Sequence, residues 1–256
     1  MPLELNDSVI GEGPDVLLLH GLFGMGSNLG ALARSLQDRY RVHSVDLPDH
    51  GRSDWLAEAS IPAYANAVAE WIDRRGLEEL SLVGHSLGGK VAMQLALTDP
   101  GRIRKLAVAD IAPVKYPGSH DAVFAALSAV ASAECGSRSE ASALMSEHLE
   151  EQMVIQFLLM SLKREPDGVY RWRFNREGLL RGYDALREPP DKAAGFDGPT
   201  IFVAGELSPY ITADQEPAIH DYFSNARIER MGGVGHWLHA EKPEAFNALV
   251  GCFLDA

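Results

Sequence analysis

The chain has 256 residues, of which 46% are hydrophobic and 8% aromatic, so one large domain can bury a core without disulfides or metals. Its formal net charge of −13 repels polyanions, which disfavours nucleic acid as the main partner. Its two cysteines, Cys135 and Cys252, are far apart and lack metal-ligand spacing, so we expect free thiols in a reducing compartment. The first residues show no secretory signal, and no apolar run approaches the roughly 20 residues that span a bilayer. These features predict a cytoplasmic protein.

The first part of the chain alternates short apolar strands with helices, which is typical of a mostly parallel sheet flanked by helices. The expected strands are 15–20, 41–47, 80–85 and 103–111. The expected helices are 29–36, one that follows Pro62, and 87–97.

The pattern changes after residue 115. From 116 to 190 we expect only helices, at 121–134, 140–151, 152–164 and 177–187. The alternation then resumes with strands at 200–205 and 227–231 and helices at 215–223 and 243–253. This organisation predicts an α/β core formed by residues 1–115 and 191–256, with residues 116–190 inserted as a helical cap, or lid, over an active site.

The motif Gly84-His85-Ser86-Leu87-Gly88 follows an apolar strand and opens a helix. A serine at such a strand-to-helix turn projects above the carboxyl end of the sheet, and small residues two positions before and after it prevent collisions. The backbone N–H of Leu87, at the helix N-terminus, points to where an oxyanion would form. We therefore predict that Ser86 is the nucleophile of an α/β-hydrolase fold.

The segment from His20 to Gly24 follows the first expected strand. In the α/β-hydrolase fold the loop at this place supplies the second N–H of the oxyanion hole. We expect Leu22 to be that donor, with Phe23 as the alternative. His20 comes too early in the chain for the order serine, acid, histidine, so we expect it to organise the loop.

The last expected strand is followed by a glycine-rich loop that contains His236. The glycines allow the imidazole to approach the nucleophile, so His236 is the predicted general base. His239 lies three residues further on, at the start of a helix, where we expect a supporting role.

The acid departs from the usual pattern of this fold, in which an aspartate follows the strand after the lid. Ser208 occupies that place, and a serine cannot carry the charge that stabilises an imidazolium. Asp110 ends the strand before the lid and precedes the histidine in the chain, so it is the predicted acid. Asp214 is the first alternative and Asp221 the second.

Large apolar side chains near these motifs are candidates for the substrate pocket, because adaptable apolar groups suit a varied acyl chain. The candidates are Phe23, Met153, Phe157, Leu158, Met160 and Trp237. Those in the lid are expected to hold the acyl chain or, equally well, to pack the lid onto the sheet. A further hypothesis is that Arg171, Arg173 and Arg176 receive an anionic leaving group such as coenzyme A.

Beyond the catalytic motifs, segments along nearly the whole chain resemble the YbfF-type bacterial esterases of the α/β-hydrolase superfamily. They are 20–24, 46–53, 84–90, 110–114, 156–159, 172–175, 208–210 and 235–243. One departure is Asp49, where the family's loop is expected to hold asparagine.

The resemblance implies a hydrolase of short-to-medium acyl esters of small molecules, with acyl thioesters as a further class. It also implies a helical cap, no cofactor and a triad of Ser86, Asp110 and His236. We expect no metal, and the sequence carries no indication of oligomeric state. Other cofactor-free serine hydrolases of this fold, which cleave C–C bonds or form peracids, stay open as alternatives. So does a non-catalytic protein that binds a small molecule on this scaffold.

Overall fold

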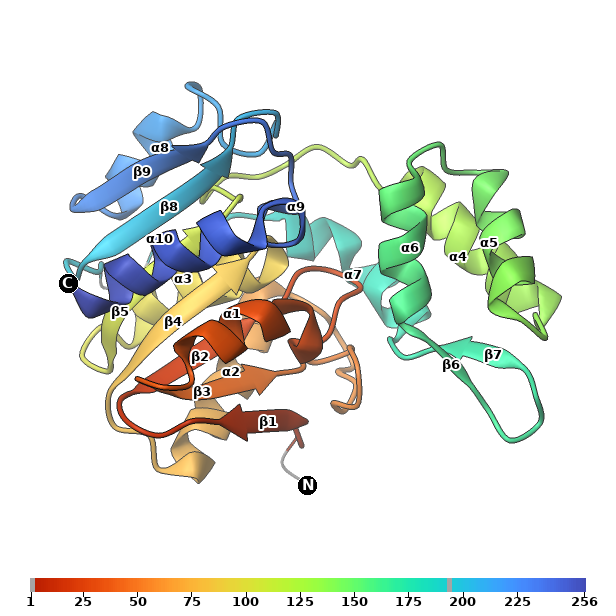
Figure 1. The fold of residues 1–256 in the computed structure, drawn as a ribbon, viewed down its shortest axis with the longest axis horizontal. Helices are drawn as coiled ribbons and strands as arrows, with labels where there is room; N and C mark the ends of the chain where they lie inside the picture. The colour runs from red at the N-terminus through yellow and green to blue at the C-terminus, as the bar shows by residue number, and fades with distance from the viewer. Residues whose placement is uncertain (1–2, 193–194) are drawn as a thin grey trace.

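The computed structural model describes residues 3–192 and 195–256, and most of its strands form one central sheet (Figure 1). Within the described residues, the order of strands across the sheet is β1 (Asp7–Ile10), β3 (Arg41–Val45), β2 (Asp15–Leu19), β4 (Leu80–His85), β5 (Ile103–Ala109), β8 (Thr200–Gly205) and β9 (Ala226–Met231). β1 runs antiparallel to β3, and every other neighbouring pair is parallel. The fold class is the expected one. The ranges expected for the core include residues 1–2 and 193–194, which lie outside the described residues.

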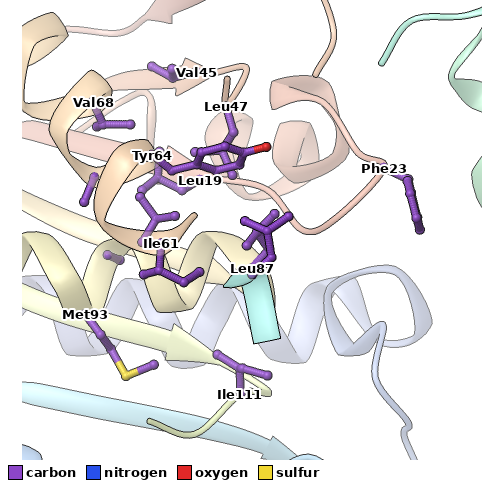
Figure 2. Packing of buried hydrophobic residues seen from close by; sticks show 14 of the residues in the cluster. Leu19, Phe23, Val45, Leu47, Ile61, Tyr64, Val68, Leu87, Met93 and Ile111 are labelled. Carbon is purple, nitrogen blue, oxygen red and sulfur yellow. The ribbon is translucent and has the colours of Figure 1, made fainter. Parts of the chain in front are cut away.

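Both faces of the sheet are apolar, because its inner strands contribute side chains to two hydrophobic clusters. Along β2, Leu17 and Leu19 belong to one cluster. Val16 and Leu18 belong to the other. The first cluster includes side chains of α2 (Ile61–Arg75), α3 (Leu87–Thr98) and α8 (Glu216–Tyr222), and the second those of α1 (Gly30–Leu36) and α10 (Pro243–Asp255). Figure 2 shows part of the first cluster, with Tyr64 of α2 among its members. Burial on both faces explains why these strands are continuous apolar runs in the sequence.

Much of the segment between β5 and β8 lies to one side of the sheet (Figure 1). In chain order the elements are α4 (Asp121–Ala133), α5 (Arg138–Ser146), α6 (Gln152–Met160), β6 (Leu162–Arg164), β7 (Tyr170–Trp172) and α7 (Arg176–Arg187). The expectation of helices alone from 116 to 190, with one at 152–164, is wrong. α6 ends at Met160, and β6 and β7 pair as an antiparallel hairpin. Gly168 lies in the turn that closes this hairpin and has a positive φ of +88°.

The helix expected at 140–151 also ends early, because α5 ends at Ser146. Most of the other differences from the expected pattern are short elements. The edge strand β1, the 3-10 helix at Gly26–Leu29 and the one-turn helix α9 (Leu238–Glu241) are each four residues long. β1 is only partly buried, so it has no clear apolar alternation.

The carboxyl ends of the parallel strands lie at one edge of the sheet, as parallel pairing requires. The segments after β2, β4, β5, β8 and β9 therefore approach one another although they are far apart in the sequence. No helix in the described part of the chain is both long and apolar enough to cross a bilayer.

Candidate active site

Ser86 lies between β4 and α3 in a strained backbone conformation, with φ of +52° and ψ of −118°. Its N–H donates to the Ala109 carbonyl on β5 at 3.0 Å, which ties the turn to the neighbouring strand. A Cβ at Gly84 would lie 2.3 Å from the Gly88 carbonyl oxygen, and one at Gly88 would lie 2.2 Å from that of Leu19. Only glycine fits both places, so the motif has the steric basis of a nucleophile elbow.

Ser86, His236 and Asp110 form a continuous chain of hydrogen bonds. His236 Nε2 lies 3.0 Å from Ser86 Oγ, and His236 Nδ1 lies 2.7 Å from Asp110 Oδ2. Because a carboxylate only accepts, Nδ1 carries the proton and Nε2 presents its lone pair to the serine hydroxyl. This is the arrangement that a general base needs to remove the hydroxyl proton.

Asp110 is fully buried directly after β5, and its backbone has a positive φ of +52°. Its Oδ1 accepts from the Gly205 N–H at 2.9 Å. Its Oδ2 accepts from His236 and also from the Ser208 hydroxyl. Ser208 therefore stands where this fold usually carries the acid, and it donates to the candidate acid Asp110, which follows the neighbouring strand. Three donors satisfy both carboxylate oxygens and fix their orientation.

The alternative acids lie elsewhere. Asp214 is exposed, and its backbone N–H faces Thr212 Oγ1. Asp221 is exposed on α8 and pairs with Lys192 at 2.8 Å. The structure brings only Asp110 of the three candidates to His236.

The candidate oxyanion hole lies between the loop after β2 and the first residue of α3. The Phe23 N–H donates to His50 Nε2 at 3.0 Å, so it is already used within the fold. Among the described residues no acceptor takes the N–H of Leu22 or Leu87, and both residues line the space around Ser86. The geometry therefore favours Leu22 over Phe23 as the second donor.

Two buried histidines hold this loop in place. His50 accepts the Phe23 N–H through Nε2, and its Nδ1 donates to the Pro48 carbonyl at 2.8 Å. His20 accepts the Leu47 N–H through Nε2 at 2.9 Å. Burial lowers the pKa of both rings, that of His50 to about 3, so each stays neutral and keeps its acceptor nitrogen. These contacts fit the structural role expected of His20.

Asp49, the departure from the family's loop, is also fully buried and has a φ of +65°. One carboxylate oxygen accepts from the Tyr64 hydroxyl at 2.9 Å, and the other accepts from Asn175 Nδ2 at 2.8 Å and from the Leu56 N–H at 3.1 Å. These three donors satisfy both oxygens of the buried carboxylate. Asp49 thus ties the loop after β3 to the residue that caps α7.

Sequence reasoning misses two side chains that contact His236. Tyr210 stacks on its imidazole with ring centroids 4.2 Å apart. His85 Nε2 donates to the His236 carbonyl at 2.9 Å, and His239 packs against His85 with centroids 4.4 Å apart. Burial lowers the pKa of His85 well below its usual value and that of His239 to about 4, so both are neutral beside the base. Adjacency to the catalytic motifs is the only signal that the sequence offers for them.

A cavity of about 830 Å³ opens beside Ser86. Its walls include five of the six expected pocket residues, which are Phe23, Met153, Phe157, Leu158 and Trp237. Met160, the sixth, does not line the cavity, and its side chain is 51% exposed. The wall reaches along α6 only as far as Leu158, and Met160 is the last residue of that helix, beyond the end of the cavity.

The three arginines that one hypothesis assigned to an anionic leaving group do not line this cavity. Arg171 pairs with Asp167 at 2.8 Å, and Arg176 donates to Ser128 Oγ at 2.7 Å. Neither of them, nor Arg173, lines the cavity. The carboxylate side chains that do line it are Glu150, Glu151 and Glu241. This charge disfavours an anionic leaving group such as coenzyme A.

The family model described as "Alpha/beta hydrolase family" matches residues 16–249. The chain is 39% identical over 241 residues to "Esterase YbfF" of Escherichia coli (strain K12), covering 94% of this chain and 92% of the relative. It is 37% identical over 249 residues to "sn-1-specific diacylglycerol lipase ABHD11" of Mus musculus, covering 94% and 81%. Among solved structures, "Marine microorganism esterase" matches with a TM-score of 0.94 and 34% identity, covering 98% of this chain and 99% of that one.

Proposed function

Because the chain belongs to the α/β-hydrolase family and is a carboxylic ester hydrolase, we propose that it is a serine esterase for short-to-medium acyl esters of small molecules. Acyl thioesters of uncharged thiols form a second substrate class. The proposed triad is Ser86, Asp110 and His236, with Leu22 and Leu87 as oxyanion donors. The observation that carries the proposal is the hydrogen-bond chain from Ser86 through His236 to Asp110.

In this proposal residues 116–190 act as a cap on the core formed by residues 1–115 and 191–256. The support is that the cavity beside Ser86 is lined both by loops at the sheet edge and by side chains of α6, such as Phe157. Both cysteines are free, which supports a reducing compartment, and we propose the cytoplasm.

The first half-reaction transfers the acyl group to the enzyme. Ser86 Oγ attacks the ester carbonyl carbon while His236 Nε2 takes the hydroxyl proton. The carbonyl oxygen becomes an oxyanion that accepts from the N–H groups of Leu22 and Leu87. Asp110 holds the imidazole tautomer and stabilises the imidazolium. The C–O bond to the alcohol then breaks, and His236 Nε2 returns its proton to the departing alkoxide.

The second half-reaction releases the acid. His236 Nε2 takes a proton from water as the water oxygen attacks the acyl carbon. The bond between that carbon and Ser86 Oγ breaks, and the proton returns from His236 to the serine oxygen. The products are one alcohol and one carboxylic acid, and every proton is accounted for by Ser86, His236 and water.

Turnover of p-nitrophenyl butanoate by Ser86→Ala tests the proposal. Loss of the nucleophile lowers kcat by about 10⁴–10⁶, the range for serine hydrolases that retain only binding and the oxyanion hole. Ser146→Ala, at an exposed serine that ends α5, is the matched control and keeps the wild-type rate. A Ser86→Ala variant that keeps most of its activity contradicts the proposal.

The alternative activities share this machinery, so substrates distinguish them. Hydrolysis of a C–C bond is tested with a dione substrate, and peracid formation with a carboxylic acid and hydrogen peroxide. Turnover of either reaction that exceeds ester turnover would replace the proposed substrate class while leaving Ser86 as the nucleophile. A protein that only binds its ligand would turn over none of the three.

A further inference from the structure

Two cavities share Ser86 as part of their walls. The large one, of about 830 Å³, is described above. The second, of about 60 Å³, lies between α3, the residues after β5 and α7. Leu22, Ser86, Ser119, His120 and Tyr210 line both. The large space and the small one therefore adjoin at the nucleophile.

The catalytic groups are divided unequally between the two spaces. His236 and Trp237 line only the large cavity. Leu87, whose N–H is a proposed oxyanion donor, lines only the small one. This asymmetry bears on how an ester can be oriented at Ser86.

The chemistry of the first half-reaction decides the orientation. When the tetrahedral intermediate collapses, the proton on His236 Nε2 must reach the oxygen of the leaving alcohol. The alcohol portion must therefore occupy the space that contains His236. The acyl chain is the other substituent of the carbonyl carbon, so it extends into the space that His236 does not line.

We infer that the small cavity is the acyl site and the large cavity the alcohol site, so that the preferred substrates are short-chain acyl esters of bulky alcohols. This inference rests on the proposed function and narrows its substrate class. It also changes the role expected for Met153, Phe157 and Leu158, which line the large cavity and would contact the alcohol rather than the acyl chain.

The volume of the small cavity sets the acyl length. At about 60 Å³ it has less than a tenth of the volume of the large cavity, which is about 830 Å³. We therefore expect acyl groups from acetyl to butanoyl to fit there and an octanoyl group to be too long. Ile111 and Leu186, which are 4% and 5% exposed, form apolar parts of the wall.

Lys90 keeps this wall from moving outward. Its side chain is 2% exposed, and its ammonium donates to the carbonyls of Val114, Arg187 and Glu188. Val114 lies where the chain leaves the core after β5, and the other two lie where it returns after α7. One ammonium therefore holds both connections between the core and the segment that supplies Leu186, and its three N–H groups are all used.

Two series of esters test the inference on the wild-type enzyme. In p-nitrophenyl esters of increasing acyl length, kcat/KM falls by about tenfold or more between butanoate and octanoate, since even one methylene that a pocket cannot hold changes kcat/KM by about 10–200-fold. In acetate esters of methanol, butanol and 2-naphthol, kcat/KM does not fall with size. An enzyme that hydrolyses octanoate as fast as butanoate, or rejects the naphthyl ester, overturns the inference. An enzyme that hydrolyses no ester at all contradicts the proposed function instead.

Variants of the two walls locate the acyl site. Leu186→Ala enlarges the small cavity and raises the octanoate-to-acetate ratio of kcat/KM by about tenfold, whereas Leu186→Phe fills it and lowers the butanoate-to-acetate ratio. Phe157→Ala, in the large cavity, is the matched control. It changes the ratios of kcat/KM among acetate esters of different alcohols and does not change those among p-nitrophenyl esters of different acyl lengths. The inference is overturned if Phe157→Ala changes the ratios of kcat/KM between acyl lengths and neither Leu186 variant changes them. If neither Leu186 variant folds, the wild-type series decide it.

Discussion

Replacing Asp110 by asparagine should stop the base from working while leaving the shape of the site intact. The carboxylate receives three donors, because Oδ1 accepts from Gly205 and Oδ2 accepts from Ser208 and His236. An amide has one oxygen and one NH₂ group, so at least one of the three donating partners must face the NH₂ group, which donates as well. If NH₂ faces Gly205, two N–H groups oppose each other. If it faces His236, the imidazole must present an unprotonated Nδ1.

The second orientation of the amide removes the base. An imidazole whose Nδ1 is unprotonated carries its proton on Nε2, where it faces the Ser86 hydroxyl and cannot accept its proton. The wrong tautomer costs about 10⁴ in kcat in hydrolases with this triad, which corresponds to about 5 kcal/mol of transition-state stabilisation. We expect a loss of that size, with KM little changed.

The assay is steady-state turnover of p-nitrophenyl butanoate by Asp110→Asn, with the thermal midpoint of unfolding measured in parallel to show that the variant is folded. Asp214→Asn is the matched control, because Asp214 is the alternative acid and is exposed. It should keep the wild-type rate. A near-wild-type Asp110→Asn together with an inactive Asp214→Asn would refute the assignment of the acid.

Two further predictions follow from the contacts around the site. Ser208→Ala removes one of the donors to the Asp110 carboxylate and should lower kcat by about tenfold, because hydrogen bonds to charged groups contribute about 1.5–3 kcal/mol; a rate equal to wild type would show that this hydrogen bond does not assist the acid. Stability should fall in mild acid, because burial lowers the pKa of His50 to about 3 and that of His239 to about 4. The unfolded chain protonates both rings near pH 6.5, so stability is complete above that pH and is lost at up to about 1.4 kcal/mol per pH unit for each ring as the pH falls toward 4. Urea midpoints at pH 7.0 and 5.5 check this, and equal midpoints would contradict it.

Much of the core follows from local patterns. The inner strands are buried on both faces, so they are apolar runs of five to seven residues in the sequence, and each was expected within two residues of its observed end. Asp110 could be predicted as the partner of His236 because a carboxylate that ends an apolar strand is unusual, and because Ser208 occupies the common position of the acid. The motif around Ser86 carries its own steric explanation in Gly84 and Gly88.

The remainder depends on contacts between distant segments. β6 and β7 are three residues each, too short for an alternation that could be separated from a continuing helix. Met160 has an apolar side chain that suits a substrate pocket, and a helical spacing from Met153. The point along α6 at which the cavity ends depends on tertiary packing, which the local sequence does not show. The stacking of Tyr210 on His236 joins loops after two different strands. The position of the small cavity relative to His236 likewise requires three segments to be packed together.

The most direct test of the account is covalent labelling with a fluorophosphonate, which reacts with a serine that has been activated by a general base. We expect one adduct per chain, which mass spectrometry of peptides locates on Ser86, and much slower labelling of His236→Gln. No adduct, or an adduct on a serine other than Ser86, would contradict the account.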